Sequence, residues 1–272
     1  MKLMIMRHGE TFWNTEGRLQ GQTDIPLDEN GIKMALSCGE GMKELPIDLC
    51  ISSTLTRAVQ TAELCMAANK GYAERAARTV KEILAEREAG EHLSVVEAPC
   101  RRTAEVCAAE YESFAEENRE FMEPSGKFLY ITDDRLVEAG FGPWEGLVCR
   151  GEGYSVPLLN FGTYWADPES PLIDERVERL THVACRVENA LSEIFSCRAL
   201  QDKTILLVVH GCVIRSVLYL MSGKTKFSGK VPLNCEVMAA HFEEDGTIVE
   251  DGREIYCDRS LVHDYYASMV QE

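Results

Sequence analysis

Two short apolar runs constrain the fold of this 272-residue chain more than any other feature. The segments 2–6 (KLMIM) and 203–209 (KTILLVV) are nearly unbroken runs of aliphatic residues. Runs of this length without polar alternation are typical of strands that helices cover on both faces. We therefore expect both segments at the centre of one parallel sheet, although they lie near opposite ends of the chain.

Helical patterns alternate with these strands. Segment 48–53 (DLCISS) is a third buried run, and apolar residues recur at helical spacing on either side of it. Strand and helix in alternation are typical of a three-layer α/β fold, with a mostly parallel central sheet flanked by helices. Near the end of the chain, two strands are expected about a turn at Asp245 and Gly246. The predicted strands are 2–6, 48–53, 203–209, 235–242 and 247–250, and the predicted helices are 31–45, 55–68 and 173–197.

The segment 71–131 interrupts this rhythm. It carries 13 acidic against 8 basic residues, and its aliphatic residues are sparse. We interpret it as a helical insertion in a single domain that spans 1–272, and we expect it to cap the site. A scaffold role, a dimer contact or a partly mobile excursion are the alternatives. Its two helical faces are predicted at Ala76, Val80, Ile83 and Leu84, and at Cys107, Tyr111 and Phe114.

Composition restricts the classes of ligand that the protein is expected to bind and the cellular compartment in which it is expected. The 45 acidic and 28 basic residues give a net charge of −17, which argues against nucleic acid and anionic membranes as partners. Eleven cysteines without a CxxC pair favour reduced thiols over a disulfide framework or a zinc site. Few apolar residues precede Arg7, and no run of about 18 apolar residues follows, so we expect a cytoplasmic protein.

Four polar motifs follow strands or lie in loops near them. They are Arg7-His8-Gly9-Glu10, Arg57, Glu138 and His210-Gly211. Ligands of open α/β sheets bind at the carboxyl ends of the strands, where segments distant in sequence meet. We therefore expect both histidines at one edge of the molecule.

A phosphate monoester is a ligand that suits these side chains. The guanidinium groups of Arg7 and Arg57 can hold phosphate oxygens through forked, charge-assisted hydrogen bonds. Cations nearby lower the pKa of an imidazole, so His8 can attack phosphorus as the neutral ring. We expect His210 to hold a phosphate oxygen, and Glu138 to protonate the leaving alkoxide and then to activate water. For Glu10 and Arg215, an ion pair or a cap is a sufficient explanation.

These motifs resemble the histidine phosphatase superfamily, in its phosphoglycerate mutase-like branch and most of all its bacterial phosphatases. The resemblance rests on RHGETFWNTEGRLQGQTDIPLDENG, SSTLTRAVQTAE, LVEAGFGPWEG, VVHGCVIRSVL and VPLNCEV. It implies His8 as the phosphorylated nucleophile and Glu138 as the proton donor. It also implies phosphate contacts from Arg7, Arg57, His210, Asn14, Gln20, Gly21 and the amide of Gly211, with no cofactor and no metal.

Two departures from the family pattern bear on the reaction. Val177-Glu178-Arg179 stands where the family has Gly-Glu-Ser, which puts the local packing in doubt. The arginine-rich segment of the mutases is missing after Glu145-Gly146-Leu147, where only Arg150 occurs. Hydrolysis of a small phosphorylated metabolite is therefore favoured over phosphoryl transfer.

Other functions stay open at this point. A mutase, or a non-catalytic protein that binds a phosphorylated ligand, is compatible with the same motifs. Chemistry at Cys212 with Arg215, or at a metal, is a weaker alternative. The sequence leaves open the particular phosphate ester, the pathway and whether the chain forms a homo-oligomer. Walls of the pocket are expected from the insertion and the loop 151–171. The aromatic candidates are Phe12, Trp144, Tyr154, Phe161, Tyr164 and Trp165, most of which are expected to pack in the core instead.

Overall fold

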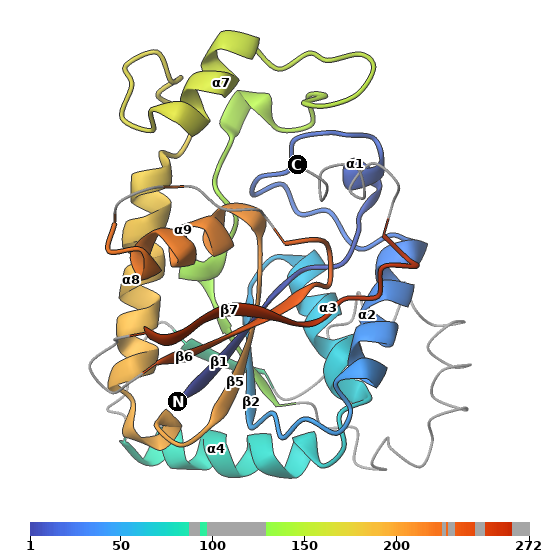
Figure 1. Ribbon diagram of the computed structural model, residues 1–272, viewed down its shortest axis with the longest axis vertical. Coiled ribbons are helices and arrows are strands. Elements are labelled where there is room, and N and C mark those ends of the chain that lie inside the picture. Colours follow the sequence, from blue (N-terminus) through green and yellow to red (C-terminus); the bar gives the residue numbers. More distant parts are fainter. Residues whose placement is uncertain (87–92, 97–128, 225–226, 228–231, 243–247, 263–272) are drawn as a thin grey trace.

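The computed structural model describes residues 1–86, 93–96, 129–224, 227, 232–242 and 248–262. In this part of the chain a seven-stranded sheet has the order β3-β4-β2-β5-β1-β6-β7 (Figure 1). The four central strands are parallel, and β3, β6 and β7 are antiparallel to their neighbours. The strands are β1 (Lys2–Arg7), β2 (Leu49–Ser53), β3 (Leu93–Val96), β4 (Tyr130–Asp133), β5 (Thr204–Val209), β6 (Val237–Phe242) and β7 (Ile248–Tyr256).

Helices cover both faces of the sheet, with α2 and α3 on one face and α8 and α9 on the other (Figure 1). The predicted three-layer α/β class is confirmed. The helices are α1 (Phe12–Thr15), α2 (Glu29–Gly41), α3 (Thr56–Ala67), α4 (Tyr72–Glu86), α7 (Leu158–Ala166), α8 (Leu180–Ser196) and α9 (Gly211–Met221), and the short 3-10 turns are η1 (Asp134–Leu136), η2 (Gly142–Trp144) and η3 (Arg198–Leu200).

Alternate side chains of β1 pack into two separate hydrophobic cores, one on each face of the sheet. Met4 and Met6 pack with residues of α2 and α3, whereas Leu3 and Ile5 pack with residues of α8 and α9. Successive side chains of a strand point to opposite faces, so an unbroken apolar run supplies both layers at once. This explains why the run 2–6 shows no polar alternation.

The structure corrects several boundaries. The helix predicted from 173 begins only at Leu180, because Asp174 forms a turn in which its carboxylate accepts the amide of Arg176 at 3.0 Å. Strand β4 and helix α7 were absent from the predicted elements. Both are short, and neither has the clear apolar period on which such a prediction depends.

Helix α4 shows what the described part of the insertion does. Arg75 Nε donates to the carbonyl of Ile47 at 2.9 Å, just before β2, and Lys203 pairs with Glu82 just before β5. These contacts lie at the amino ends of the parallel strands, below them in Figure 1 and away from the carboxyl edge. Helix α4 is therefore part of the scaffold, and the expected cap does not include it.

The predicted faces of the insertion fare differently. Ala76, Val80 and Ile83 are buried as predicted, but Leu84 is 59% exposed, because it follows Ile83 by one residue and so leaves that face. Residues 130–131 belong to β4 rather than to the insertion. The second face, and residues 97–128 as a whole, lie outside the described residues, so a cap there stays a prediction. None of the described helices is long and apolar enough to cross a bilayer.

Candidate active site

The pairing of β1 with β5 places the two histidines side by side. Arg7 lies opposite Val209 in the parallel register, and the amide of His8 donates to the carbonyl of Val209 at 3.0 Å. His8 and His210 directly follow the last residues of β1 and β5, and their ring centroids lie 5.1 Å apart. The expectation that both histidines meet at one edge is confirmed.

The ring of His8 is buried and held in one orientation. Its Nδ1 lies 2.7 Å from the carbonyl oxygen of Gly9, which can only accept, so Nδ1 carries the proton and Nε2 keeps its lone pair. Burial lowers the pKa of His8 well below 6.5, and the charges of Arg57 and Arg7 lower it further. The ring therefore stays neutral and nucleophilic at neutral pH.

A close approach of the backbone explains the glycine that follows His8. A Cβ atom at Gly9 would lie 2.7 Å from the carbonyl oxygen of Gly31, which is nearer than atoms can pack. The amide of Gly9 in turn donates to Thr61 Oγ1 at 2.9 Å. Helices α2 and α3 thus fix the turn that carries the His8 ring.

Arg57 projects from the first turn of α3 and is fully buried. Its guanidinium donates to the carbonyls of Gly21 at 2.7 Å and Thr23 at 3.1 Å. Burial lowers its pKa to about 10, so the group remains a cation at neutral pH. Its Nε is buried without a hydrogen-bond partner among the described residues, as expected of a donor that awaits an anion.

Arg7 completes the positive side of the site. It is the last residue of β1, and its Nη1 donates to the carbonyl of Pro232 at 3.1 Å. The charge of Arg7 lowers the pKa of His8, His210 and Arg57, so all four groups lie close together. Such a concentration of cations is costly unless a ligand neutralises it.

His210 depends on a serine that ends β2. Its Nε2 lies 2.8 Å from Ser53 Oγ, and the amide of Leu55 donates to the same oxygen at 3.3 Å. The hydroxyl can therefore give its own proton to Nε2, which leaves the ring proton of His210 on Nδ1. That Nδ1 is buried and has no partner in the part of the chain described, so it is available to a phosphate oxygen. Burial is the main cause that lowers the pKa of His210, ahead of Arg57 and His8.

The carboxylate of Glu138 contacts the backbone in the first turn of α9. Its Oε1 accepts the amides of Ala139 at 2.9 Å and Cys212 at 3.0 Å. Arg186 braces the same loop by donating to the carbonyls of Val137 at 2.6 Å and Glu138 at 3.0 Å. The acid is thus fixed at the edge where His210 emerges.

Glu178 resolves the doubt that the Val-Glu-Arg departure raised. Its carboxylate pairs with Arg186 at 2.8 Å and accepts the amide of Gly140 at 3.0 Å. The acid that the departure retains is therefore the residue that braces the Glu138 loop.

The other predicted phosphate contacts gather around the first loop. Asn14 Oδ1 accepts the amide of Thr11 at 3.2 Å, and Gln20 Nε2 donates to Thr11 Oγ1. Gly21 presents its carbonyl to Arg57, and Gly211 is the first residue of α9, directly after His210. All the predicted site residues thus lie around one edge of the sheet, and their roles stay predictions.

The alternative with Cys212 as nucleophile finds no support. Burial raises the pKa of this thiol well above its ordinary value, and the nearby charge of Glu138 raises it further. A thiol in this state is not the thiolate that cysteine phosphatases require.

Three residues around the site escaped the sequence reasoning. Ser53 could have been found as the polar residue that ends a central strand beside β5. Asn234, whose Nδ2 donates to the carbonyl of His8 at 2.8 Å, stood in a recognised motif without a role. Arg186 gave no signal, because it lies on an amphipathic helix like many surface arginines.

Of the aromatic candidates, Trp144 and Tyr164 belong to the core, with exposures of 3% and 0%. Trp165 differs, because it lines a pocket and faces Arg215.

Comparisons with known proteins agree with this geometry. The sequence profile of the histidine phosphatase superfamily (branch 1) matches residues 3–127 and 100–253. The chain belongs to the histidine phosphatase superfamily.

Curated relatives match a smaller part of the chain. The 2,3-bisphosphoglycerate-dependent phosphoglycerate mutase of Chlamydia muridarum is 47% identical over 64 residues, and the same enzyme of Protochlamydia amoebophila is 46% identical over 66 residues. These matches cover 24% of this chain and 28% and 29% of the two mutases. The chain therefore matches less than a third of the length of these mutases.

Solved structures resemble nearly the whole chain in fold. YhfR of Bacillus stearothermophilus has a TM-score of 0.62 at 22% identity, and a mycobacterial glucosyl-3-phosphoglycerate phosphatase has 0.59 at 19%; each match covers 93% of this chain and 96% of the other. Phosphoserine phosphatase of Entamoeba histolytica has 0.59 at 20%, covering 96% and 98%. At these identities the likeness shows the fold alone.

Replacement of Ser53 tests the orientation of His210. We expect Ser53→Ala to lower kcat about tenfold, the effect of one lost hydrogen bond, because Nε2 then loses its donor and the ring proton can move. Ring 15N chemical shifts of His210 should report the changed tautomer. Ser52→Ala is the matched control, since Ser52 Oγ donates to the carbonyl of Ser53 at 2.9 Å rather than to the ring. Equal effects of the two variants, with unchanged ring shifts, would contradict this role.

The depressed pKa values of His8 and His210 predict the pH dependence of stability. Each imidazole binds a proton more readily in the unfolded chain, where its pKa is about 6.5, than in the folded one. The contribution of these histidines to the free energy of unfolding should therefore stay constant above about pH 6.5 and decrease as the pH falls below that value. Denaturant unfolding from pH 8 to 5 checks this, and the fall should weaken in His8→Asn. A wild-type profile identical to that of the variant would refute it.

Proposed function

We propose that this protein is a metal-independent phosphomonoester hydrolase that works through a phosphohistidine at His8. One observation carries the proposal: the neutral ring of His8 keeps Nε2 unprotonated beside the cations of Arg7 and Arg57. A nucleophile and an anion clamp at one place are what phosphoryl transfer from an ester requires.

The first half of the reaction forms the intermediate. His8 Nε2 attacks phosphorus, the bond from phosphorus to the ester oxygen breaks, and Glu138 gives its proton to the departing alcohol. Arg7, Arg57 and the Nδ1–H of His210 neutralise the charge on the phosphoryl oxygens.

The second half releases phosphate. Glu138, now ionised, takes a proton from water as the water oxygen attacks phosphorus, and the P–N bond breaks. The electron pair returns to His8 Nε2, so the ring and the acid regain their starting states.

The segment between η2 and α7 supports hydrolysis rather than isomerisation. Arg150 is the single arginine there, and it donates to the carbonyl of Asn14 at 3.1 Å. Two of the solved neighbours are named as phosphatases of small phosphate esters. In the described residues no group of three His, Cys, Asp or Glu side chains gathers as metal ligands.

A mutase is the second candidate, because the mutase of Chlamydia muridarum is 47% identical to this chain over 64 residues. In that reaction the phosphoryl group on His8 returns to a phosphoglycerate instead of passing to water.

Turnover of simple esters distinguishes the two candidates. We expect the purified protein to release phosphate from 4-nitrophenyl phosphate and from small metabolite phosphates in excess EDTA. We expect no interconversion of 2- and 3-phosphoglycerate with or without 2,3-bisphosphoglycerate. His8→Ala should reduce phosphate release by more than about 10³-fold, because the phosphohistidine can then no longer form at this position.

The opposite results are equally clear. Bisphosphoglycerate-dependent isomerisation faster than hydrolysis would establish the mutase. Phosphate binding without turnover, unchanged in His8→Ala, would establish a binding protein instead.

A further inference from the structure

One face of α9 leads away from the proposed site. Cys212, Arg215 and Tyr219 lie three and four residues apart, so they share a face of the helix. The amide of Cys212 contacts Glu138 at one end, and Tyr219 lines a pocket at the other. Arg215 therefore lies between the proposed acid and the pocket.

Among the residues that the structure describes, Arg215 is a cation without a paired carboxylate. Its Cζ lies 4.9 Å from the centroid of the Trp165 ring, which holds the guanidinium by a cation–π contact. Its Nε is buried without a hydrogen-bond partner, and among the described residues no carboxylate pairs with it. The ion pair or cap that would explain this arginine is thus missing from the described structure.

Three other arginines of the described residues differ from Arg215 in this respect. Arg135, Arg176 and Arg186 each pair with a carboxylate. Burial lowers the pKa of Arg215, Glu138 opposes this shift and Arg7 adds to it, so both act on the group across the site. A partly buried cation kept in place by a ring, with its Nε donor unused among the described residues, is suited to an anionic ligand.

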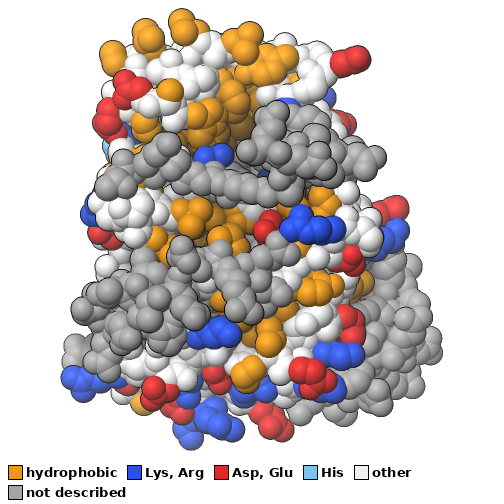
Figure 2. Space-filling model, viewed as in Figure 1, with side chains coloured by type: hydrophobic (Ala, Val, Ile, Leu, Met, Phe, Trp, Pro, Cys, Tyr) orange, Lys and Arg blue, Asp and Glu red, His pale blue; other side chains and the backbone are white. Residues whose placement is uncertain are grey.

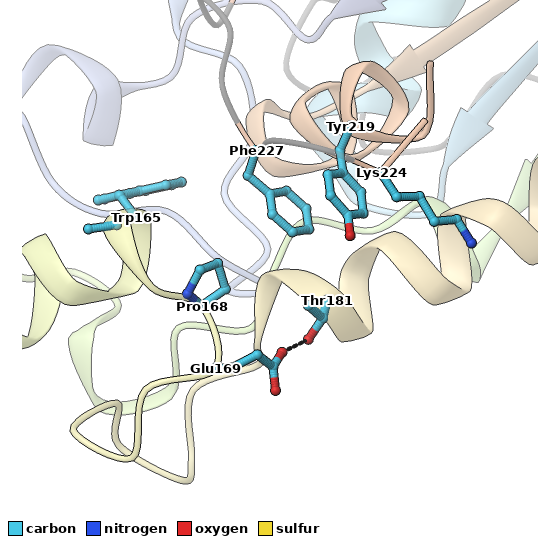
Figure 3. Close-up of a pocket in the computed structure, with 8 residues that line it drawn as sticks. Trp165, Pro168, Glu169, Thr181, Tyr219, Lys224 and Phe227 are labelled. Atoms are coloured by element: carbon cyan, nitrogen blue, oxygen red, sulfur yellow. Dashed lines mark hydrogen bonds between the residues drawn. The ribbon is translucent and has the colours of Figure 1, made fainter. Parts of the chain in front are cut away.

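The pocket beyond Arg215 has room for the rest of such a ligand. Its volume is about 420 Å³, and Trp165 on one side faces Tyr219 and Phe227 on the other (Figure 3). The rings of Tyr219 and Phe227 stack at 3.9 Å. Lys224 at the rim already pairs with Glu188, so it offers the ligand less charge than Arg215 does. Figure 2 shows hydrophobic side chains gathered near α7 at the top of the view, above a hollow.

We infer that Arg215, seated on Trp165, binds a carboxylate on the alcohol part of the substrate, and that the pocket receives what lies beyond it. The substrate class is then a phosphate monoester of a hydroxy acid. One unpaired cation matches one carboxylate, whose two oxygens fit the fork of a guanidinium. The inference rests on the proposed function, because the phosphate of the same ester would occupy Arg7 and Arg57.

Matched pairs of esters test the inference. O-Phosphoserine is compared with O-phosphoethanolamine, and 3-phosphoglycerate with glycerol 3-phosphate, which differ in the carboxylate. We expect wild-type kcat/KM to favour the acid of each pair, and Arg215→Gln to lower this preference ratio by about 10- to 100-fold, as for a lost charged hydrogen bond. Arg215→Lys should restore part of the ratio, since it restores the charge.

Arg176→Gln is the matched control, because Arg176 is an exposed arginine paired with Asp174, and it should leave the ratio unchanged. A wild-type preference that Arg215→Gln does not alter, or no preference at all, would overturn the carboxylate subsite while hydrolysis stands. Failure of the wild-type protein to hydrolyse 4-nitrophenyl phosphate or any of the four esters would overturn the proposed function, and the subsite with it.

Discussion

The parallel pairing of β1 with β5 is the constraint on which the site depends. Arg7 lies opposite Val209, and the residue that follows each strand is a histidine, so the backbone of neither histidine can shift without disturbing the central sheet. Slipping this register would separate His8 from His210, and the backbone hydrogen bond from His8 to Val209 opposes it. The most buried part of the fold thus fixes the most reactive part of the molecule.

Burial then sets the charge state of the site. Removing two imidazoles from water near guanidinium groups keeps both rings neutral, so the positive charge resides on the arginines. A neutral nucleophile beside fixed cations binds a dianion without repelling it and without losing its own lone pair. Ser53 and Gly9 add direction to this arrangement, because each fixes one ring nitrogen and leaves the other to the substrate.

Local patterns in the sequence predicted much of this structure. The runs at 2–6 and 203–209 predicted the central strands, because buried parallel strands need apolar residues on both faces, and the position of the histidines followed from strand polarity. The bracing role of Arg186 could not be predicted, since it depends on Glu178 and on backbone carbonyls of a loop whose path no local pattern encodes. Helix α4 was assigned to a possible cap. Its amphipathic face predicts that the helix packs on the protein, but it does not predict at which end of the sheet the helix packs.

The most direct measurement is the position of phosphorus on the protein during turnover. Uniformly 15N-labelled protein is loaded with a phosphate donor, quenched in alkali to preserve phosphohistidine, and examined by 31P–15N coupling and peptide mapping. The account predicts phosphorus on Nε2 of His8, because Nδ1 is held by the carbonyl of Gly9. Phosphorus on Nδ1 of His8, on His210 or on Cys212 would contradict it.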